Sequence, residues 1–204
     1  MPRDKSEASI RIIWAAKKEF MENGFERASM RTIAAEAGMS AAGLYRHFAD
    51  KEAMFEALLK PLFEQFRIEF EKHKRMDYIL LESNQLDDMW QNNADLKLLI
   101  QLMYDYHDEF KLLLCCAQGT KHENFIHDFV AMEERETLEY MQEAKRAGIS
   151  VNDIVPKELH LLLSAYYTAV FEIIVHDFSR EEAEHYLETL QKFFYPGWRS
   201  VLGL

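Results

Sequence analysis

The stretch that most constrains the fold is a pair of short predicted helices near the start of the chain, MRTIAAEAGMSAAGLYRHFADK, residues 30–51. Small and apolar side chains recur at helical spacing over residues 30–37, so the first helix is predicted there. Gly38 follows, where a helix end commonly needs a left-handed backbone. Ser40 would cap a second helix over residues 41–48. Such a pair forms a helix-turn-helix, whose second helix can lie in a DNA major groove, although the hinge alone also fits an ordinary helical corner.

The rest of the chain is also predicted to be helical, so the fold class is all-α. Apolar residues recur at intervals of three and four, and few segments alternate as strands do. A first helix over residues 4–23, ended by Gly24, would brace the pair. A longer helix begins after Asp50 and contains Pro61, and its apolar stripe exceeds what a small N-terminal core can cover. We predict an N-terminal three-helix helix-turn-helix domain at residues 1–51, joined by this connector helix to a C-terminal bundle at residues 52–204.

Three more helices are predicted in the second half. One covers residues 124–145 and another residues 157–176, and Ser179 with Glu182 would form the capping box of the last. Pro196 and Gly197 would end that last helix.

Charge is distributed unevenly along the chain, which has a net charge of −11. Residues 1–51 contain nine basic and seven acidic residues, so the acidic excess lies entirely in the remainder. This asymmetry predicts that only the first part of the chain meets phosphate.

Several classes of protein are not favoured by the sequence. Residues 159–175 are apolar but contain polar side chains, so they indicate a buried helix and not a membrane span. No leader segment is visible, and the adjacent Cys115 and Cys116 beside leucines predict buried, inert thiols in a reduced cytoplasmic protein. The eight histidines lack metal-ligand spacing and are interpreted as solvated surface. Without a nucleophile motif or a phosphate-binding loop, we predict neither an enzyme nor a cofactor or metal site.

The residues around the predicted pair resemble the TetR/AcrR family of bacterial transcriptional regulators. The resemblance covers about 45 residues and includes NGF after the first helix, SMRTIA, GMS in the turn, GLYRHF in the second helix, and KE directly after it. The ending FFYPGWRSVLGL is also similar to the family. The resemblance implies an all-helical homodimer with a DNA-binding N-terminal domain and a ligand-binding, dimerising C-terminal domain. Most members of the family are repressors that a small ligand releases from DNA.

The resemblance also implies positions that contact operator DNA. Tyr45, His47 and Lys51 match positions that contact the DNA backbone, and Arg31 matches one that reaches phosphate or base edges. Ser29 and Ser40 match capping positions that also lie near phosphates. Base reading would fall to Ala41, Ala42, Gly43 and Arg46, where a Lys and a Thr are frequent in the family. Alanine methyl groups can contact thymine but form no hydrogen bonds, so Arg46 is the one guanine reader, unless it only pairs with Asp50. The poor base-reading set leaves an alternative, a helical small-molecule-binding or interaction protein that no longer binds DNA.

The C-terminal half is predicted to hold the dimer interface and an effector pocket. The helices from Leu159 to Val175 and from Ala183 to Phe194 would supply two helices per protomer to a four-helix interface. A largely apolar effector would bind among aromatic and methionine side chains, each of which could equally be core. The candidates are Phe66, Trp90, Met103, Tyr104, His107, Phe110, Phe125, Phe129 and Met132.

Overall fold

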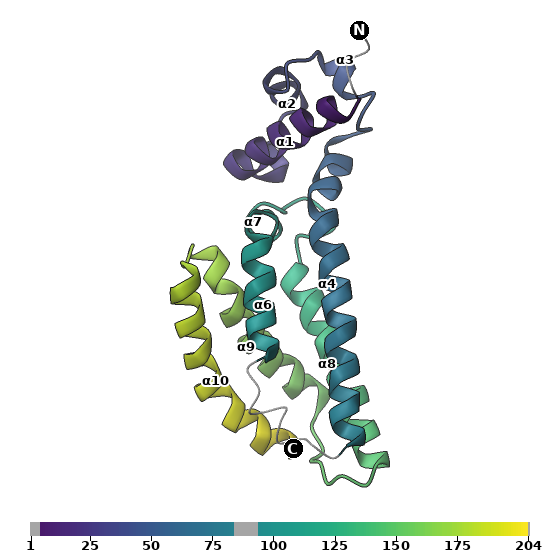
Figure 1. Ribbon diagram of the computed structural model, residues 1–204, viewed down its shortest axis with the longest axis vertical. Helices are drawn as coiled ribbons and strands as arrows, with labels where there is room; N and C mark the ends of the chain where they lie inside the picture. The colour runs from purple at the N-terminus through teal and green to yellow at the C-terminus, as the bar shows by residue number, and fades with distance from the viewer. Residues whose placement is uncertain (1–4, 84–93, 204) are drawn as a thin grey trace. The chain divides into compact units, whose positions relative to one another are not determined.

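The computed structural model describes residues 5–83 and 94–203, and side chains from residue 7 onward except 84–96. Every regular element in this described part is an α-helix, which confirms the predicted fold class (Figure 1). The contacts between Cα atoms divide the chain into two compact units. Unit 1 is Met1–Gln65 with Tyr106–Glu123, and unit 2 is Phe66–Asp105 with Asn124–Leu204.

Unit 1 is built from three N-terminal helices, the start of a fourth, and a later segment of the chain. The helices are α1 (Lys5–Arg27), α2 (Met30–Glu36), α3 (Ala41–Leu44) and the first part of α4 (Lys51–Glu82), and the later segment begins with α7 (His107–Cys115). The rings of Phe20, Phe25 and Phe55 pack with centroids 5.2–5.8 Å apart. The Phe25 amide also donates to the Cys116 carbonyl at 2.8 Å, so the later segment closes this aromatic core.

Unit 2 contains the second part of α4 with α6 (Ala94–Asp105), α8 (Phe125–Arg146), α9 (Pro156–Val175) and α10 (Arg180–Leu202). Within this unit α8 and α9 lie side by side, and α10 contacts both α6 and α9 (Figure 1). A buried cluster, the unit 2 core, joins residues of α8, α9 and α10: Val130, Met141, Leu159, Leu163, Trp198 and Leu202.

The predicted end of the last helix at Pro196 and Gly197 is wrong, because α10 continues to Leu202. Proline inside a helix removes one backbone hydrogen bond. Past it, Trp198 and Leu202 are buried in the unit 2 core, and Gly203 ends the helix at φ 75°. Tertiary packing of the last turn therefore outweighs the local signal to stop.

The cysteine prediction holds for only one of the two thiols. Cys116 is buried, and burial raises the pKa of its thiol. Cys115, the last residue of α7, is exposed.

The division into a helix-turn-helix domain at residues 1–51 and a C-terminal bundle at residues 52–204 stays a prediction. The compact units are drawn differently, because the 106–123 segment packs against α1 and the beginning of α4. The α9 helix is long and apolar enough to cross a membrane by composition, but its inward face is buried against α8 and α10.

Candidate nucleic-acid interface and ligand cavity

The turns of the predicted helix-turn-helix are fixed by side-chain caps. The Ser40 hydroxyl accepts from the Gly43 amide at 3.1 Å and begins α3, while the Asp50 carboxylate accepts from the Ala53 amide at 2.7 Å and begins α4. Ser29 caps α2, and its own amide donates to the buried Glu19 carboxylate at 2.9 Å. These local hydrogen bonds fix the first residue of each short helix, and so they fix the position of α3 between α2 and α4 in the chain.

The exposed side of α3 and the turn after it carries polar and aromatic groups. Tyr45 is 53% exposed, and Arg46 and His47 are also exposed. Leu44 and Gly43 are buried, and the Gly43 amide is already bonded to Ser40. Gly43 is therefore removed from the predicted base-reading set, whereas Ala42 is exposed and Ala41 half-buried.

The structure favours a free role for Arg46 over an ion pair with Asp50. In the described part of the chain, neither Arg46 nor Arg31 forms an ion pair, and both are exposed. The Asp50 carboxylate instead caps α4. Both guanidinium groups are thus available to an anionic partner.

Lys51 is held by its own chain more than the resemblance implies. Its ammonium donates to the backbone carbonyls of Glu26 at 2.9 Å and Ala28 at 3.3 Å, and lies 4.5 Å from the centroid of the Phe25 ring. An ammonium has three N–H donors, so one remains for a phosphate. Lys51 therefore links the start of α4 to the end of α1, and this structural role is independent of any contact with DNA.

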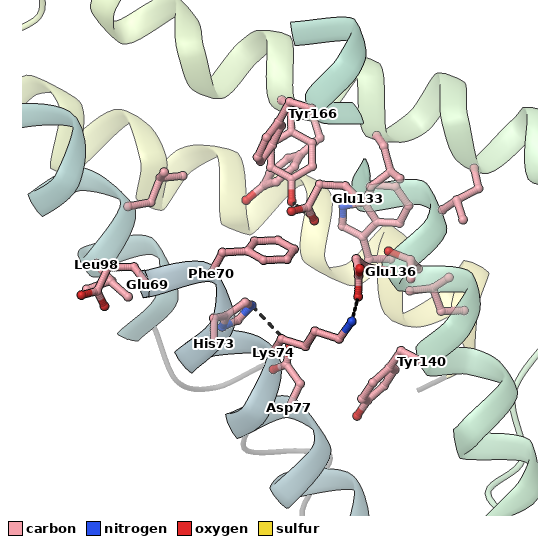
Figure 2. Close-up of a pocket in the computed structure, with 18 of the residues that line it drawn as sticks. Glu69, Phe70, His73, Lys74, Asp77, Leu98, Glu133, Glu136, Tyr140 and Tyr166 are labelled. Carbon is pink, nitrogen blue, oxygen red and sulfur yellow. Dashed lines mark hydrogen bonds and ion pairs between the residues drawn. The ribbon is translucent and has the colours of Figure 1, made fainter. Parts of the chain in front are cut away.

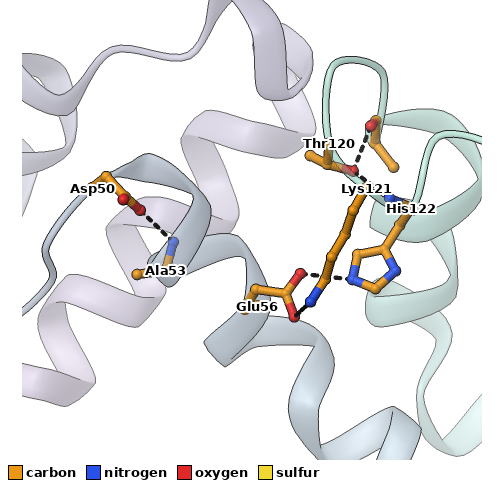
Figure 3. A network of polar contacts seen from close by, with 7 residues as sticks. Asp50, Ala53, Glu56, Thr120, Lys121 and His122 are labelled. Carbon is orange, nitrogen blue, oxygen red and sulfur yellow. Dashed lines mark hydrogen bonds and ion pairs between the residues drawn. The ribbon is translucent and has the colours of Figure 1, made fainter.

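The 116–123 segment is fastened to α4 by a polar network (Figure 3). Glu56 accepts from the Lys121 ammonium at 2.9 Å, and its other oxygen lies 2.7 Å from His122 Nε2. The His122 ring also packs on Phe63 with centroids 5.0 Å apart, and only 17% of its side chain is exposed. The interpretation of all histidines as solvated surface is wrong for His122, because this later segment packs back onto unit 1.

Unit 2 contains a cavity of about 330 Å³ that is partly open to solvent, lined by residues of α4, α6, α8, α9 and α10. Most of its lining is aromatic or aliphatic, including Phe66, Phe70, Phe129, Tyr140, Tyr166, Tyr167, Tyr195 and Trp198. Figure 2 shows Phe70, His73 and Lys74 of α4 facing Glu133 and Glu136 of α8 across this space. A largely apolar cavity of this size with a few inward polar groups is typical of a small-molecule site.

The charged groups of the cavity are mostly paired. The Lys74 ammonium bonds to Glu136, which raises the pKa of Lys74, and His73 lies 3.3 Å from Asp77. Glu133 is different, because it accepts from the Tyr167 hydroxyl at 2.7 Å. Burial raises the pKa of the Glu133 carboxyl and of the Tyr167 hydroxyl.

Of the predicted pocket residues, Phe66 and Phe129 line this cavity and their rings meet at 5.6 Å. His107 and Phe110 belong to unit 1, where Phe110 is fully buried. Four others lie in unit 2 outside the lining: Met103, Tyr104, Phe125 and Met132. Tyr104 donates to the Phe178 carbonyl at 2.6 Å, and Met103 is fully buried core. Trp90 lies outside the described residues.

The charged residues that line the cavity were not among the predicted pocket residues, although the sequence contains a signal for them. On α4 the lining residues recur at threes and fours from Phe66 through Phe70 to His73 and Asp77. On α8 the same spacing connects Phe129 to Glu133. A charged residue in register with an apolar stripe faces the same side of the helix, and this register distinguishes it from solvated surface.

A short capped recognition element carried on an all-helical body defines the class of helix-turn-helix regulators. The sequence pattern described as "Bacterial regulatory proteins, tetR family" matches residues 12–58, which contain the turn between α2 and α3. The N-terminal part of the chain thus matches the TetR family of transcriptional regulators, in agreement with the resemblance. This family is not enzymatic.

Individual relatives agree with this assignment. The HTH-type transcriptional regulator UidR of Escherichia coli is 39% identical over 59 residues, which is 29% of this chain and 30% of UidR. The match therefore spans about a third of that relative. The HTH-type transcriptional regulator SAR2658 of Staphylococcus aureus is 27% identical over 178 residues, 84% of each chain. The crystal structure of NalD, the secondary repressor of the MexAB-OprM multidrug efflux pump in Pseudomonas aeruginosa, shares the fold with a TM-score of 0.55, 20% identity, and coverage of 93% of this chain and 97% of NalD.

Proposed function

We propose that the protein is a dimeric transcriptional repressor that binds a palindromic operator and is released by a small, largely apolar effector. The observation that carries the proposal is the exposed set on and beside α3, Tyr45, Arg46 and His47, joined by Arg31 of α2. Positively charged and hydroxyl side chains of this kind supply most phosphate contacts in protein–DNA complexes. Such a protein would act in the cytoplasm, where the DNA is.

The proposed base contacts come from few residues. Ala42 is exposed and can meet a thymine methyl group, and Arg46 can pair with both acceptors of a guanine. Because Arg46 is the one proposed hydrogen-bonding reader, specificity at one base pair of each half-site should depend on it. Tyr45, His47 and the third N–H of Lys51 would set the register on the phosphates, with Arg31, Ser29 and Ser40 beside them.

The proposed dimer uses the outer faces of α9 and α10. Leu161 is 68% exposed on α9, with Leu162 and Ala165 exposed beside it, and Phe193 is 76% exposed on α10. Exposed leucine and phenylalanine on adjacent helices form the kind of apolar surface that a second copy covers. Two-fold symmetry would then place two α3 helices roughly 34–36 Å apart, one turn of DNA.

The proposed effector response runs through α4. The helix begins at Lys51 in unit 1, and its later residues from Phe66 to Tyr78 line the cavity of unit 2. A ligand that binds two arrangements of this helix with different affinity would shift the population between them, and only that difference can change operator affinity.

The test is a gel-shift titration with the DNA upstream of the protein's own gene at several salt concentrations. Wild type should bind with a steep salt dependence. Tyr45→Ala and Arg46→Ala should each weaken binding, by about 1–3 kcal/mol for Arg46, and Arg46→Ala should relax the preference at a single base pair.

Lys145→Ala is the matched control, because Lys145 is exposed at the end of α8 in unit 2 and pairs with Asp153. It removes one positive charge without touching α3, so operator affinity should not change. Equal, weak binding by all variants would reject the DNA-reading role and favour a small-molecule-binding protein that no longer binds DNA.

A further inference from the structure

The close contacts of the cavity, in the described part of unit 2, place three of its acidic side chains in ion pairs and leave one, Glu133, outside them, with His73 acting on it only at longer range. Lys74 bonds to Glu136 and lies 4.0 Å from Glu139, His73 lies 3.3 Å from Asp77, and Glu69 pairs with Lys72 at 2.8 Å. Among the residues that the structure describes, Glu133 forms no ion pair and accepts a single hydrogen bond, from a neutral phenol.

The position of Glu133 makes an uncompensated charge on its carboxylate unfavourable. Its carboxylate lies between α8 and the rings of α9, and its folded-state pKa is raised by burial. The side chain is half-buried, and a carboxylate withdrawn from water is unfavourable unless a cation compensates it. The hydrogen bond from Tyr167 uses part of the hydrogen-bonding capacity of one carboxylate oxygen, and it does not neutralise the negative charge.

Aromatic rings surround the same position. Phe129 lies one helical turn before Glu133, and its ring meets the Tyr167 ring with centroids 4.7 Å apart. Tyr166 lies beside Tyr167 at 5.1 Å and also meets Trp198 at 6.5 Å. Electron-rich ring faces attract an organic cation, and they stabilise its apolar substituents at the same time.

We propose that the cavity binds a small organic cation with an aromatic or aliphatic body, and that Glu133 is its counter-ion. The ammonium lies against the Glu133 carboxylate and the rings of Phe129 and Tyr167, and the apolar body fills the remaining space toward Leu159 and Leu163. The inference rests on the proposed function in one respect, namely that this cation is the effector.

A soft, poorly hydrated cation suits this site better than a metal ion or a compact inorganic cation. Two other carboxylates of the lining act on Glu133, and both are already paired, Asp77 with His73 and Glu136 with Lys74. Among the described residues no group of three or more histidine, cysteine or acidic side chains is arranged to hold a metal ion. A cation that loses little hydration on entering an aromatic cavity is the chemistry that remains.

The test compares two probes of the same shape, phenethyltrimethylammonium and its neutral carbon isostere, neohexylbenzene. Their binding to the full-length protein is measured by isothermal titration calorimetry at neutral pH. Wild type should bind the cation at least about tenfold more tightly than the isostere. Glu133→Gln should lose that preference, because the amide keeps the volume and the bond from Tyr167 but carries no charge.

Glu143→Gln is the matched control, since Glu143 pairs with Arg146 near the end of α8 and is not one of the residues that line the cavity. It removes the same charge from the same helix and should leave both affinities unchanged. Circular dichroism and thermal melting establish that each variant is folded. Equal affinity of wild type for both probes, or undiminished cation binding by Glu133→Gln, would overturn the proposal.

The calorimetry separates this inference from the proposed function because it contains no DNA. Cation binding that depends on Glu133 supports the ligand class even in a protein that fails the gel-shift test. If the protein binds its operator but binds the cation no more tightly than the neutral isostere, the proposed regulatory function stands and the proposed ligand class is rejected. Where both hold, the cation should lower operator affinity of wild type and leave that of Glu133→Gln unchanged, and no effect on wild type would contradict its role as effector.

Discussion

Replacing Lys51 by methionine tests whether this residue holds the helix-turn-helix together. The variant keeps the length and helix propensity of the side chain but removes its three N–H donors. In the native protein two of these donors bond to the carbonyls of Glu26 and Ala28, and the ammonium lies over the Phe25 ring. Loss of Lys51 therefore removes the polar link between the start of α4 and the end of α1, while the packing of Phe25 on Phe55 remains.

The expected magnitude follows from these contacts. A hydrogen bond from a charged donor contributes about 1.5–3 kcal/mol. The cation–π contact adds about 0.5–1 kcal/mol at an exposed site. Lys51 is half-buried, so water replaces part of what is lost, and we expect unit 1 to open more easily by about 2 kcal/mol. This difference corresponds to about thirtyfold faster exchange of amides that exchange through that opening.

Hydrogen-exchange mass spectrometry of peptides covering α2 and the turn before it measures this change. Lys60→Met is the control in the same helix, because Lys60 is 71% exposed and lies 3.7 Å from Glu64. An exposed pair of this kind contributes less than about 1 kcal/mol, so exchange should change little. If Lys51→Met exchanges like wild type, the two carbonyl contacts do not stabilise the turn, and Lys51 is left with a phosphate-binding role alone.

Three further predictions concern unit 2. Asn152→Ala removes two bonds to the last carbonyls of α10, at 3.0 and 3.2 Å, and should cost about 1–2 kcal/mol, measured by urea denaturation. Leu161→Glu and Phe193→Glu should each yield monomers in analytical ultracentrifugation at micromolar concentration, and persistent dimers would place the interface elsewhere. Burial raises the folded-state pKa of Glu133, so the folded state binds its proton more tightly than the unfolded state. Stability should therefore fall as pH rises from the unfolded value of 4.5 through the folded pKa, and Glu133→Gln should remove this decline in urea melts across that range.

Local signals in the sequence were sufficient for the helix-turn-helix. Ser40 and Asp50 cap the helices predicted to begin after them, although α3 ends at Leu44 and not at residue 48, and Gly38 has the left-handed backbone expected after α2, with φ 69°. These features depend on residues a few positions apart, so no long-range contact is needed to predict them. The same holds for Tyr45, Arg46 and Leu44, whose exposure or burial follows from helical spacing.

The sequence by itself determined the all-helical class, the starts of the short helices and the similarity of residues 12–58 to the TetR family. Only the tertiary structure decided that α10 continues past Pro196, that His122 is enclosed against Glu56, and which residues line the cavity. The physical reason is that the last turn of α10, the His122 contact and the cavity lining depend on contacts between segments far apart in the chain. Helical periodicity shows which residues share a face, but it cannot show whether that face meets a core, a partner or a cavity.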